Sequence, residues 1–316
     1  MSAIITGHEV YTGWRKQDNF NTMADSPKVN TANVGDPSNA VIANPFGFNL
    51  KITGLTTAEG AHPLQDLGHG VVTQFAYGKL SRNFSAEWIL SDHRFLELIM
   101  GKFEGNTYSY AQAIVPFTQF LTFGFEEGDT TKINRQLIGC LLNSVNIRFG
   151  VGQEDVMCNA SVLCGIDGSD TDIDMSADNL IDEPEHSPYT FDHAKIMVGE
   201  EKLGEAQNVE LTIDPKHQLV YKTGQAHAAS GHKTLTEYRG KATFTFVGGA
   251  GLELVKRRGK EMTMSIMIAN SPKKIEYKLE QIQFLEHSNP TIEPNQLVTQ
   301  DLSFQAQTMT VEIDDS

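Results

Sequence analysis

The chain has 316 residues, of which 40% are hydrophobic and 21% charged, an ordinary composition for a globular protein. Its formal net charge of −15, from 25 basic and 40 acidic residues, argues against a protein that grips nucleic acid by the phosphates, because such a protein needs a basic face. The length corresponds to about two domains, and no run approaches the roughly 18 consecutive apolar residues of a membrane span.

Alternating apolar and polar residues, the pattern of strands with one buried face, recur from residue 117 to the end of the chain. Many short strands of this kind, separated by Gly, Asn and Asp turns, predict an all-β fold that is either a sandwich or a barrel. The residues expected to face the core are Phe117, Leu121, Phe123, Phe125, Val145, Ile147, Phe149, Val156, Cys158, Ala160, Val162, Cys164, Ala242, Phe244, Phe246, Met262, Met264, Ile266, Ile268, Leu302, Phe304, Ala306, Met309, Val311 and Ile313.

Two segments break this alternation and are expected to form one helix in each half of the chain. In the first, Ser91–Lys102, Ser91 is expected to cap the free N–H groups and Gly101 to end the helix. The second, Gly251–Lys260, repeats the plan more weakly and ends at Gly259. The apolar faces of the two helices consist of Phe95, Leu98 and Ile99 and of Leu252 and Val255.

The two halves share an order of elements: a strand, a polar loop, a strand that opens near a Gly-Lys pair, a helix and several alternating strands. In the first half, strand Phe48–Thr53 precedes the polar loop 54–70 and the pair Gly78-Lys79. In the second half, strand Val209–Ile213 precedes the polar loop 214–234 and the pair Gly240-Lys241. The shared order, more than the shared letters, predicts two copies of one design.

Residues 166–186 hold eight acidic residues and no Lys or Arg, so more than half of the net charge lies in one stretch. Such a run predicts a solvated linker or an exposed loop. The expected organisation is a first β domain with an N-terminal arm over 1–165, the acidic linker over 166–186 and a second β domain over 187–316. The eight acids are Asp167, Asp170, Asp172, Asp174, Asp178, Asp182, Glu183 and Glu185.

The three cysteines, Cys140, Cys158 and Cys164, are an odd number and form no CxxC pair, so neither a disulfide framework nor a zinc knuckle is indicated. All three lie in apolar, strand-like stretches. There a thiol usually acts as a small hydrophobic residue of the core. Free thiols of this kind fit a reducing compartment best.

Two short patterns resemble ligand-binding loops without completing them. Asp170, Asp172 and Asp174 have the spacing of a calcium loop, but Met175 stands where the loop needs Gly and Ile181 stands where it needs a bidentate Glu. A solvated acidic loop is the preferred interpretation. Between the second predicted strand and helix, a phosphate-binding pattern lacks its third Gly and the following Lys, so a permissive turn is preferred; its residues are Gly248, Gly249, Gly251 and Leu254.

Other candidate sites also have a plainer interpretation. His227 and His232 could ligate a metal, but no carboxylate lies close by in sequence, and a mobile loop that touches another subunit is preferred. The chain has no Gly-x-Ser-x-Gly sequence, and no enzyme activity is expected. A basic run at the end of the second predicted helix favours a solvated or salt-bridging face over contact with DNA or the acidic linker; it comprises Lys256, Arg257, Arg258 and Lys260.

Three stretches carry a resemblance to a known family. Residues 78–105, GKLSRNFSAEWILSDHRFLELIMGKFEG, read as a strand followed by a helix that ends near a Gly. Residues 121–165 read as a hairpin, a G-C-x-x-N-S sequence and two amphipathic strands, and residues 7–27 as an N-terminal arm. Together they resemble the tail tube proteins of tailed phages and related viruses. The resemblance covers residues 1 to about 165, whereas the second half is similar mostly in its order of elements.

This resemblance implies two tandem tail-tube-like β-sandwich or barrel domains, each with a flanking helix. Subunits of this family join their inner sheets into rings, and the rings stack into a hollow tube through which viral DNA is ejected. Single-domain members form hexameric rings, so a tandem pair is expected to close the ring as a homotrimer with pseudo-sixfold symmetry. Loops 54–70 and 214–234 are then the candidates for contacts between stacked rings, and the acidic balance suits a lumen that repels phosphates.

The resemblance also implies partners and a location. Tape measure, tail terminator and tail tip proteins are the expected partners, DNA passes through the lumen without specific binding, and no membrane contact is expected. The protein is expected in the virion tail after assembly in the host cytoplasm. It implies no catalytic, cofactor-binding or metal-binding residue.

Three alternatives remain open from the sequence. A head–tail connector or other tail component would form one ring without stacking. A carbohydrate-binding β-sandwich would place aromatic residues on one surface patch, whereas Trp14 and Trp88 are far apart in sequence. A hydrolase would bring Ser, His and Asp side chains together in one pocket.

Overall fold

The computed structural model describes residues 10–22, 24, 42–64, 74–123, 133–151, 153–168, 181–182, 184, 187–190, 194–199, 201–202, 206–245, 262–270, 273–287 and 299–314. These residues form antiparallel β-sheets and one short helix, which confirms the predicted all-β class. No helix within the described ranges is long and apolar enough to cross a membrane. The predicted boundaries at 165 and 186 stay a prediction.

The main sheet has eleven strands, eight of which follow one another along a continuous path. The path runs β18 (Gln283–His287), β19 (Thr299–Ala306), β15 (Glu237–Thr245), β12 (Ala206–Asp214), β7 (Ile133–Gly150), β8 (Gln153–Cys164), β3 (Gln74–Ile89) and β2 (Phe48–Leu64). Three further strands extend it near the start of β7, namely β1 (Val10–Lys16), β6 (Phe117–Phe123) and β9 (Ile166–Gly168).

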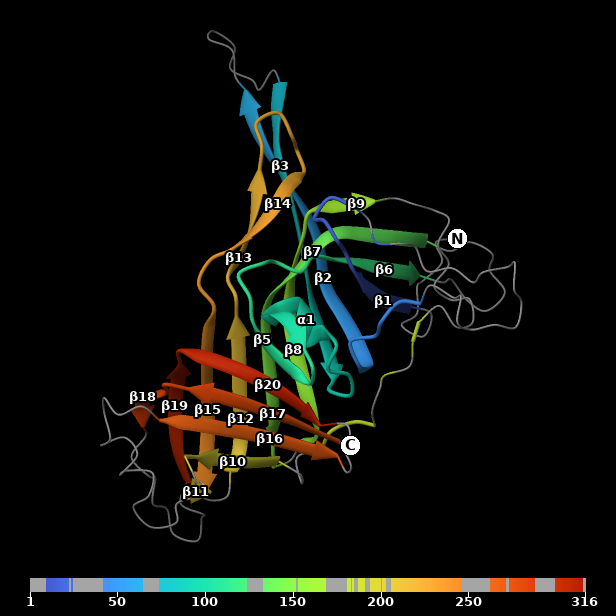
Figure 1. Ribbon diagram of the computed structural model, residues 1–316. Coiled ribbons are helices and arrows are strands. Elements are labelled where there is room, and N and C mark those ends of the chain that lie inside the picture. The colour runs from blue at the N-terminus through green and yellow to red at the C-terminus, as the bar shows by residue number, and fades with distance from the viewer. Residues whose placement is uncertain are drawn as a thin grey trace, which may run out of the picture.

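A second sheet runs across the main one in front of β12, β15 and β19 (Figure 1). Its order is β11 (Glu201–Lys202), β10 (Ala194–Val198), β16 (Thr263–Asn270), β17 (Lys273–Glu280), β20 (Thr308–Asp314), β5 (Thr107–Tyr110) and β4 (Gly101–Glu104). A separate hairpin, β13 (His217–Tyr221) and β14 (Ala228–Lys233), extends away from both sheets beside β3 (Figure 1).

The space between the sheets holds one hydrophobic cluster that takes side chains from both halves of the chain. The alternation predicted it well, because every second residue of β8, β15, β16, β19 and β20, and of β7 from Val145 onward, points into this space. Met262 precedes β16 and is half-buried, a small departure from the expected pattern. Phe125, Phe246 and the side chain of Phe123 lie outside the described residues.

Aromatic side chains that are distant in sequence meet in this core. Phe46 lies between the two tryptophans, with its ring centroid 5.9 Å from that of Trp14 and 5.0 Å from that of Trp88. Phe117 and Phe95 pack edge-on against Trp14 and Trp88. Both tryptophans are buried, so they stabilise the core and present no aromatic surface.

The first helix is shorter than expected and begins differently. It spans α1 (Phe95–Met100), and Ser91 does not cap it, because the Ser91 hydroxyl accepts a hydrogen bond from the Phe48 backbone N–H instead. Gly101 ends the helix in the left-handed conformation (φ 98°), as predicted. The second predicted helix, 251–260, lies outside the described residues.

The polar loops predicted at 54–70 and 214–234 are wrong where the structure describes them. Residues 54–64 continue β2, and residues 217–233 form the hairpin β13–β14. Both segments project from the body of the sheet (Figure 1), and most side chains of residues 54–59 and 217–233 are exposed, so the alternation that marks a half-buried strand is missing.

The eight-strand path consists of two four-strand units with the same internal order. The first is β2-β3-β8-β7 and the second is β12-β15-β19-β18. Even an irregularity repeats: β7 carries one extra residue between Leu142 and Ser144 opposite β8, and β18 carries one between Phe284 and Glu286 opposite β19. A shared bulge at the same place strengthens the equivalence, because bulges are specific features of a sheet.

A second run of four strands also repeats. The order β1-β6-β7-β9 in the first half matches β10-β16-β17-β20 in the second. The Gly-Lys pairs, in contrast, are not equivalent. Gly240 pairs with Phe304 of β19, whereas Gly78-Lys79 precedes Arg82, where the pairing of β3 with β8 begins. The order of the described strands therefore agrees with the predicted repeat, whereas the Gly-Lys letters do not mark equivalent positions; the two tandem domains stay a prediction.

Candidate functional site

The main sheet has two open edges, and the repeat makes them complementary. Among the described strands β2 pairs only with β3, and β18 pairs only with β19. In the repeat β2 corresponds to β12 and β18 corresponds to β7. Within the chain β7 and β12 pair over 145–150 and 208–213, so β2 and β18 belong to strands whose counterparts pair with each other. The bulge correspondence makes His287 the counterpart of Val145, the first residue of that pairing, and the positions after His287, 288–298, lie outside the described residues.

Side chains at the open edges are more exposed than their counterparts inside the sheet. Val209 of β12 pairs with Ala242 and is 2% exposed. Its counterpart Ile52 of β2 pairs with Ala86 but is only half-buried. At the other edge Leu285 of β18 is 52% exposed. Ile52 lacks the neighbouring strand that covers Val209, whereas Leu285 is the extra residue of the β18 bulge and corresponds to Asn143, which precedes the β7–β12 pairing.

The face of the main sheet that points away from the core is polar. One row across it reads Met157, Arg148, Glu210, Lys241 and Ser303 in direct register. Since strands alternate between faces, these residues lie opposite the buried Ile147, Leu211 and Ala242 of the same strands. The outward face is thus polar over β7, β12, β15 and β19, whereas the same row continues onto β3 and β2 through the apolar Ile89 and Phe48.

Charges of both signs meet on this face. Lys241 Nζ lies 2.9 Å from Asp301 Oδ2, and Arg239 lies 3.4 Å from Asp214 and 3.3 Å from Glu237. A hydrogen bond from Thr243 and the nearby Lys241 lower the pKa of Asp301, so this carboxylate stays ionised. The described part of the face therefore carries paired charges rather than carboxylates alone.

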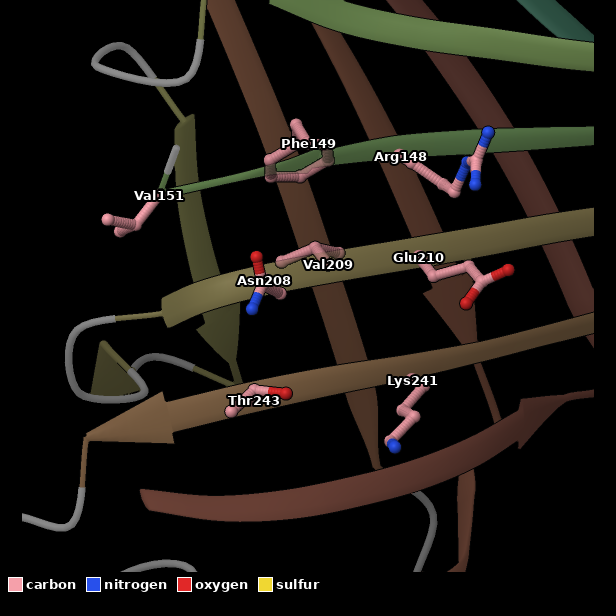
Figure 2. Close-up of a pocket in the computed structure, with 8 residues that line it drawn as sticks. All are labelled: Arg148, Phe149, Val151, Asn208, Val209, Glu210, Lys241 and Thr243. Atoms are coloured by element: carbon pink, nitrogen blue, oxygen red, sulfur yellow. The ribbon is translucent and has the colours of Figure 1, made fainter. Parts of the chain in front are cut away.

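A shallow pocket of about 440 Å³ opens on the same face (Figure 2). Its polar lining comes from three adjacent strands, β7, β12 and β15, and neither a cysteine, a serine nor a histidine lines it. The pocket therefore lacks the Ser, His and Asp side chains that the hydrolase alternative would bring together. Its lining residues are Arg148, Phe149, Val151, Asn208, Val209, Glu210, Lys241 and Thr243 (Figure 2).

The hairpin arm, defined as residues 217–233, docks on the first half of the chain. The Leu80 backbone N–H donates to the Ala226 carbonyl oxygen (2.8 Å), and the Tyr221 hydroxyl donates to the Leu80 carbonyl oxygen (2.8 Å). Beneath it Phe20 and Leu141 form a small apolar cluster with Ala228. The described part of the first predicted loop, 54–64, and residues 217–233 of the second thus belong to neighbouring hairpins.

The predicted metal and phosphate candidates do not assemble into a site within the described residues. His227 Nδ1 lies 3.4 Å from Arg82 Nη1, and His232 is exposed on β14. The described residues contain no group of three or more His, Cys, Asp or Glu that could hold a metal ion. The acidic positions 170–174, the glycines at 248–251 and the basic run at 256–260 lie outside the described ranges.

The cysteines are core residues, as predicted. All three are buried and free, with Cys140 Sγ 3.4 Å from Cys164 Sγ. Burial raises the pKa of Cys140 and of Cys158, which suppresses the reactive thiolate.

The described ends of the predicted acidic linker attach to the first half of the chain. Its first residues, Ile166–Gly168, form β9 beside β7, which corrects the expectation of a solvated segment there. Asp167 pairs with Arg135, and Asp182 Oδ2 lies 2.7 Å from Arg94 Nη1. Arg94 also binds the buried Asp92. The sequence did not predict the pair of Arg94 with Asp182, because no spacing rule connects residues so far apart along the chain.

Comparison of the sequence with models of known protein families and with curated proteins finds no match. The proposed function therefore rests on the strand order and on the internal repeat.

Proposed function

We propose that the protein is a structural virion component that self-assembles into stacked rings, forming the hollow tail tube through which viral DNA is ejected. One observation carries this proposal: the strand order repeats within the chain, and the two open edges are counterparts of strands that pair at its centre. A unit that already joins its own copy edge to edge can join further copies in the same way.

In this proposal β18 of one chain pairs with β2 of the next, as β7 pairs with β12 within the chain. Such a contact joins different surfaces of each copy, and it closes into a ring when the rotation between units is constant. Each chain contributes two units, so three chains give a ring with pseudo-sixfold symmetry. Closure would also pair every edge strand and remove a route to aggregation.

The two faces of the main sheet would have different roles in the ring. One face is covered by the second sheet, so the polar face lines the bore. There, basic side chains held by Asp301, Asp214 and Glu237 offer fewer free cations to DNA phosphates. DNA could then slide without specific binding. The hairpin arm and the extended β2–β3 hairpin project together and are our candidates for contacts between rings.

The proposal is tested by the mass and shape of the purified protein. Light scattering combined with negative-stain electron microscopy should show rings with the mass of three chains, or hollow rods. Rings of six chains would retain the tube but reject the pseudo-symmetry. A compact monomer at all concentrations, with or without tail partners, would contradict the proposal.

A matched pair of variants tests the edge contact itself. Leu285→Asp places a charge on the open edge of β18 and should abolish ring formation. Leu235→Asp alters a leucine that is 64% exposed and lies between β14 and β15, away from both edges, so its rings should retain the wild-type mass. Equal ring formation by the two variants would show that β18 is not the joining edge.

The alternatives find less support. The buried Trp14 and Trp88 offer no stacking surface for a sugar, and the pocket in Figure 2 contains no Ser, His or Asp of a hydrolase triad. A connector that forms a single ring would use the same edges, and the absence of rods in the micrographs would favour it.

A further inference from the structure

The base of the hairpin arm holds two buried ionisable side chains that face each other. His217 begins β13, Lys233 ends β14, and the two residues are direct cross-strand partners. Only 5% of His217 and 2% of Lys233 is exposed. Neither forms an ion pair with a carboxylate among the described residues, although buried charges are usually paired.

Backbone dipoles and a ring face surround the Lys233 ammonium group. Its Nζ donates to the carbonyl oxygens of Ile99 (3.2 Å), Met100 (3.4 Å) and Ala111 (3.0 Å). It also lies 4.4 Å from the centre of the Tyr110 ring. The first two carbonyls belong to the last turn of α1, where the helix dipole favours a cation, but none of these groups carries a full negative charge.

These contacts do not fully replace water. Burial lowers the pKa of Lys233 to about 8, which means that the charged form is disfavoured in the docked arm. His217 cannot offset the charge, because an imidazole is either neutral or cationic. Its Nδ1 donates to the Leu142 carbonyl oxygen (2.8 Å), and burial lowers its pKa to about 4, so it is neutral beside Lys233 at pH 7. Tyr110 from β5 and His217 from β13 are the titratable groups that face the ammonium group; α1 contributes backbone carbonyls.

The arm is a structural unit of its own. It forms its own two-stranded sheet and joins β12 and β15 only through residues 215–216 and 234–236. In the first of these links Lys216 has a φ of 48°, a left-handed conformation that is unusual for a residue other than glycine. Such a connection is a natural hinge, because a short link between separately paired strands can absorb a change in direction.

We propose that the hairpin arm is hinged, and that the charge of Lys233 opposes its docking on α1 and β3. Undocking hydrates the ammonium group, whereas loss of its proton tightens docking. Lys233 is thus a positioning residue that sets the fraction of chains whose arm is free. This inference goes beyond the tube proposal and is tested on the unassembled chain, so the two can fail independently.

The test is amide hydrogen exchange of the arm, corrected for the intrinsic exchange rate at each pH and referenced to β16 and β17. Protection of residues 217–233 in the wild type should rise about tenfold or more between pH 7 and pH 9.5, because the docked arm releases a proton that the free arm retains. Lys233→Met should show high protection already at pH 7 and little change with pH. The matched control Lys222→Met, at an exposed position of the same arm, should behave like the wild type.

Two results would overturn the inference. Wild-type protection that stays constant or falls between pH 7 and pH 9.5 would show that the charge does not oppose docking. Lower protection in Lys233→Met than in the wild type would show that the ammonium group holds the arm in place. The wild-type series decides the question even where a variant fails to fold.

Discussion

The junction between β7 and β12 and the pair of open edges at β2 and β18 are built from equivalent strands but have different surroundings. At the junction the inward-facing residues Val209 and Leu211 are 2% and 1% exposed. At the edge of β2 the corresponding Ile52 and the nearby Leu55 are only half-buried. The difference shows that Ile52 and Leu55 are only half-buried because β2 lies at the edge of the sheet. We expect a further strand paired with β2 to bury both side chains.

The sharpest way to break this comparison is to place a charge at equivalent positions of the two strands. Val209→Asp buries a carboxylate without a partner and should cost about 4 kcal/mol of unfolding free energy or prevent folding. Ile52→Asp should cost the monomer about 1 kcal/mol, because the side chain can reach solvent, yet it should abolish rings. Urea unfolding of the monomers and light scattering of concentrated samples measure both effects. Equal destabilisation by the two substitutions would reject the comparison.

Truncation of leucines gives a second, smaller contrast. Leu211→Ala leaves a cavity in the packed core and should cost about 3 kcal/mol. Leu55→Ala removes a half-buried side chain and should cost about 1 kcal/mol in the monomer. In assembled rings the cost of Leu55→Ala should approach that of Leu211→Ala, which thermal unfolding of monomer and ring samples can compare. An unchanged cost on assembly would mean that no strand covers β2.

A third prediction concerns the acid sensitivity that His217 gives to the base of the hairpin arm. Burial holds the pKa of His217 at about 4, below its ordinary value of 6.5. The unfolded chain therefore binds the proton first as the pH falls, and His217 should lower the stability by about 2 kcal/mol between pH 7 and pH 4.5. His217→Gln should lose this part of the acid sensitivity, measured as the difference between the two unfolding free energies. Parallel losses in the two proteins would exclude His217 as the cause.

The sequence predicted the parts of this comparison that depend on alternation. The inward-facing residues of β7, β8, β15 and β19 follow a period of two because one face of each strand is buried, and all of those described lie in the core. The extended part of β2 and the hairpin arm escaped prediction, because both sides of these strands are largely exposed. The helix start at Ser91 was wrong because its hydroxyl bonds to Phe48, a partner distant in sequence.

The edge complementarity could not be predicted from the sequence at all. It depends on β12 following β7 in the sheet, although β8 to β11 lie between them along the chain. The shared bulges at Leu142 and Phe284 are equally invisible, since the flanking residues have no common pattern. The repeated Gly-Lys letters pointed to the right conclusion at inequivalent positions, so only the strand pairing identifies which residues correspond.

The smallest expected effect concerns the polar face and separates stability from function. Lys241 is half-exposed and pairs with Asp301, so Lys241→Met should change the unfolding free energy by less than about 1 kcal/mol. Because the nearby lysine helps to lower the pKa of Asp301, that carboxylate should titrate at higher pH in the variant, and its modest stabilisation should fade earlier as the pH falls. NMR titration of the Asp301 carboxyl measures this shift. The same variant should form rings with the wild-type mass, because Lys241 lies on the face of the sheet and not at its edges. Loss of rings would show that this face also joins subunits, and would contradict the proposal that only the open edges do so.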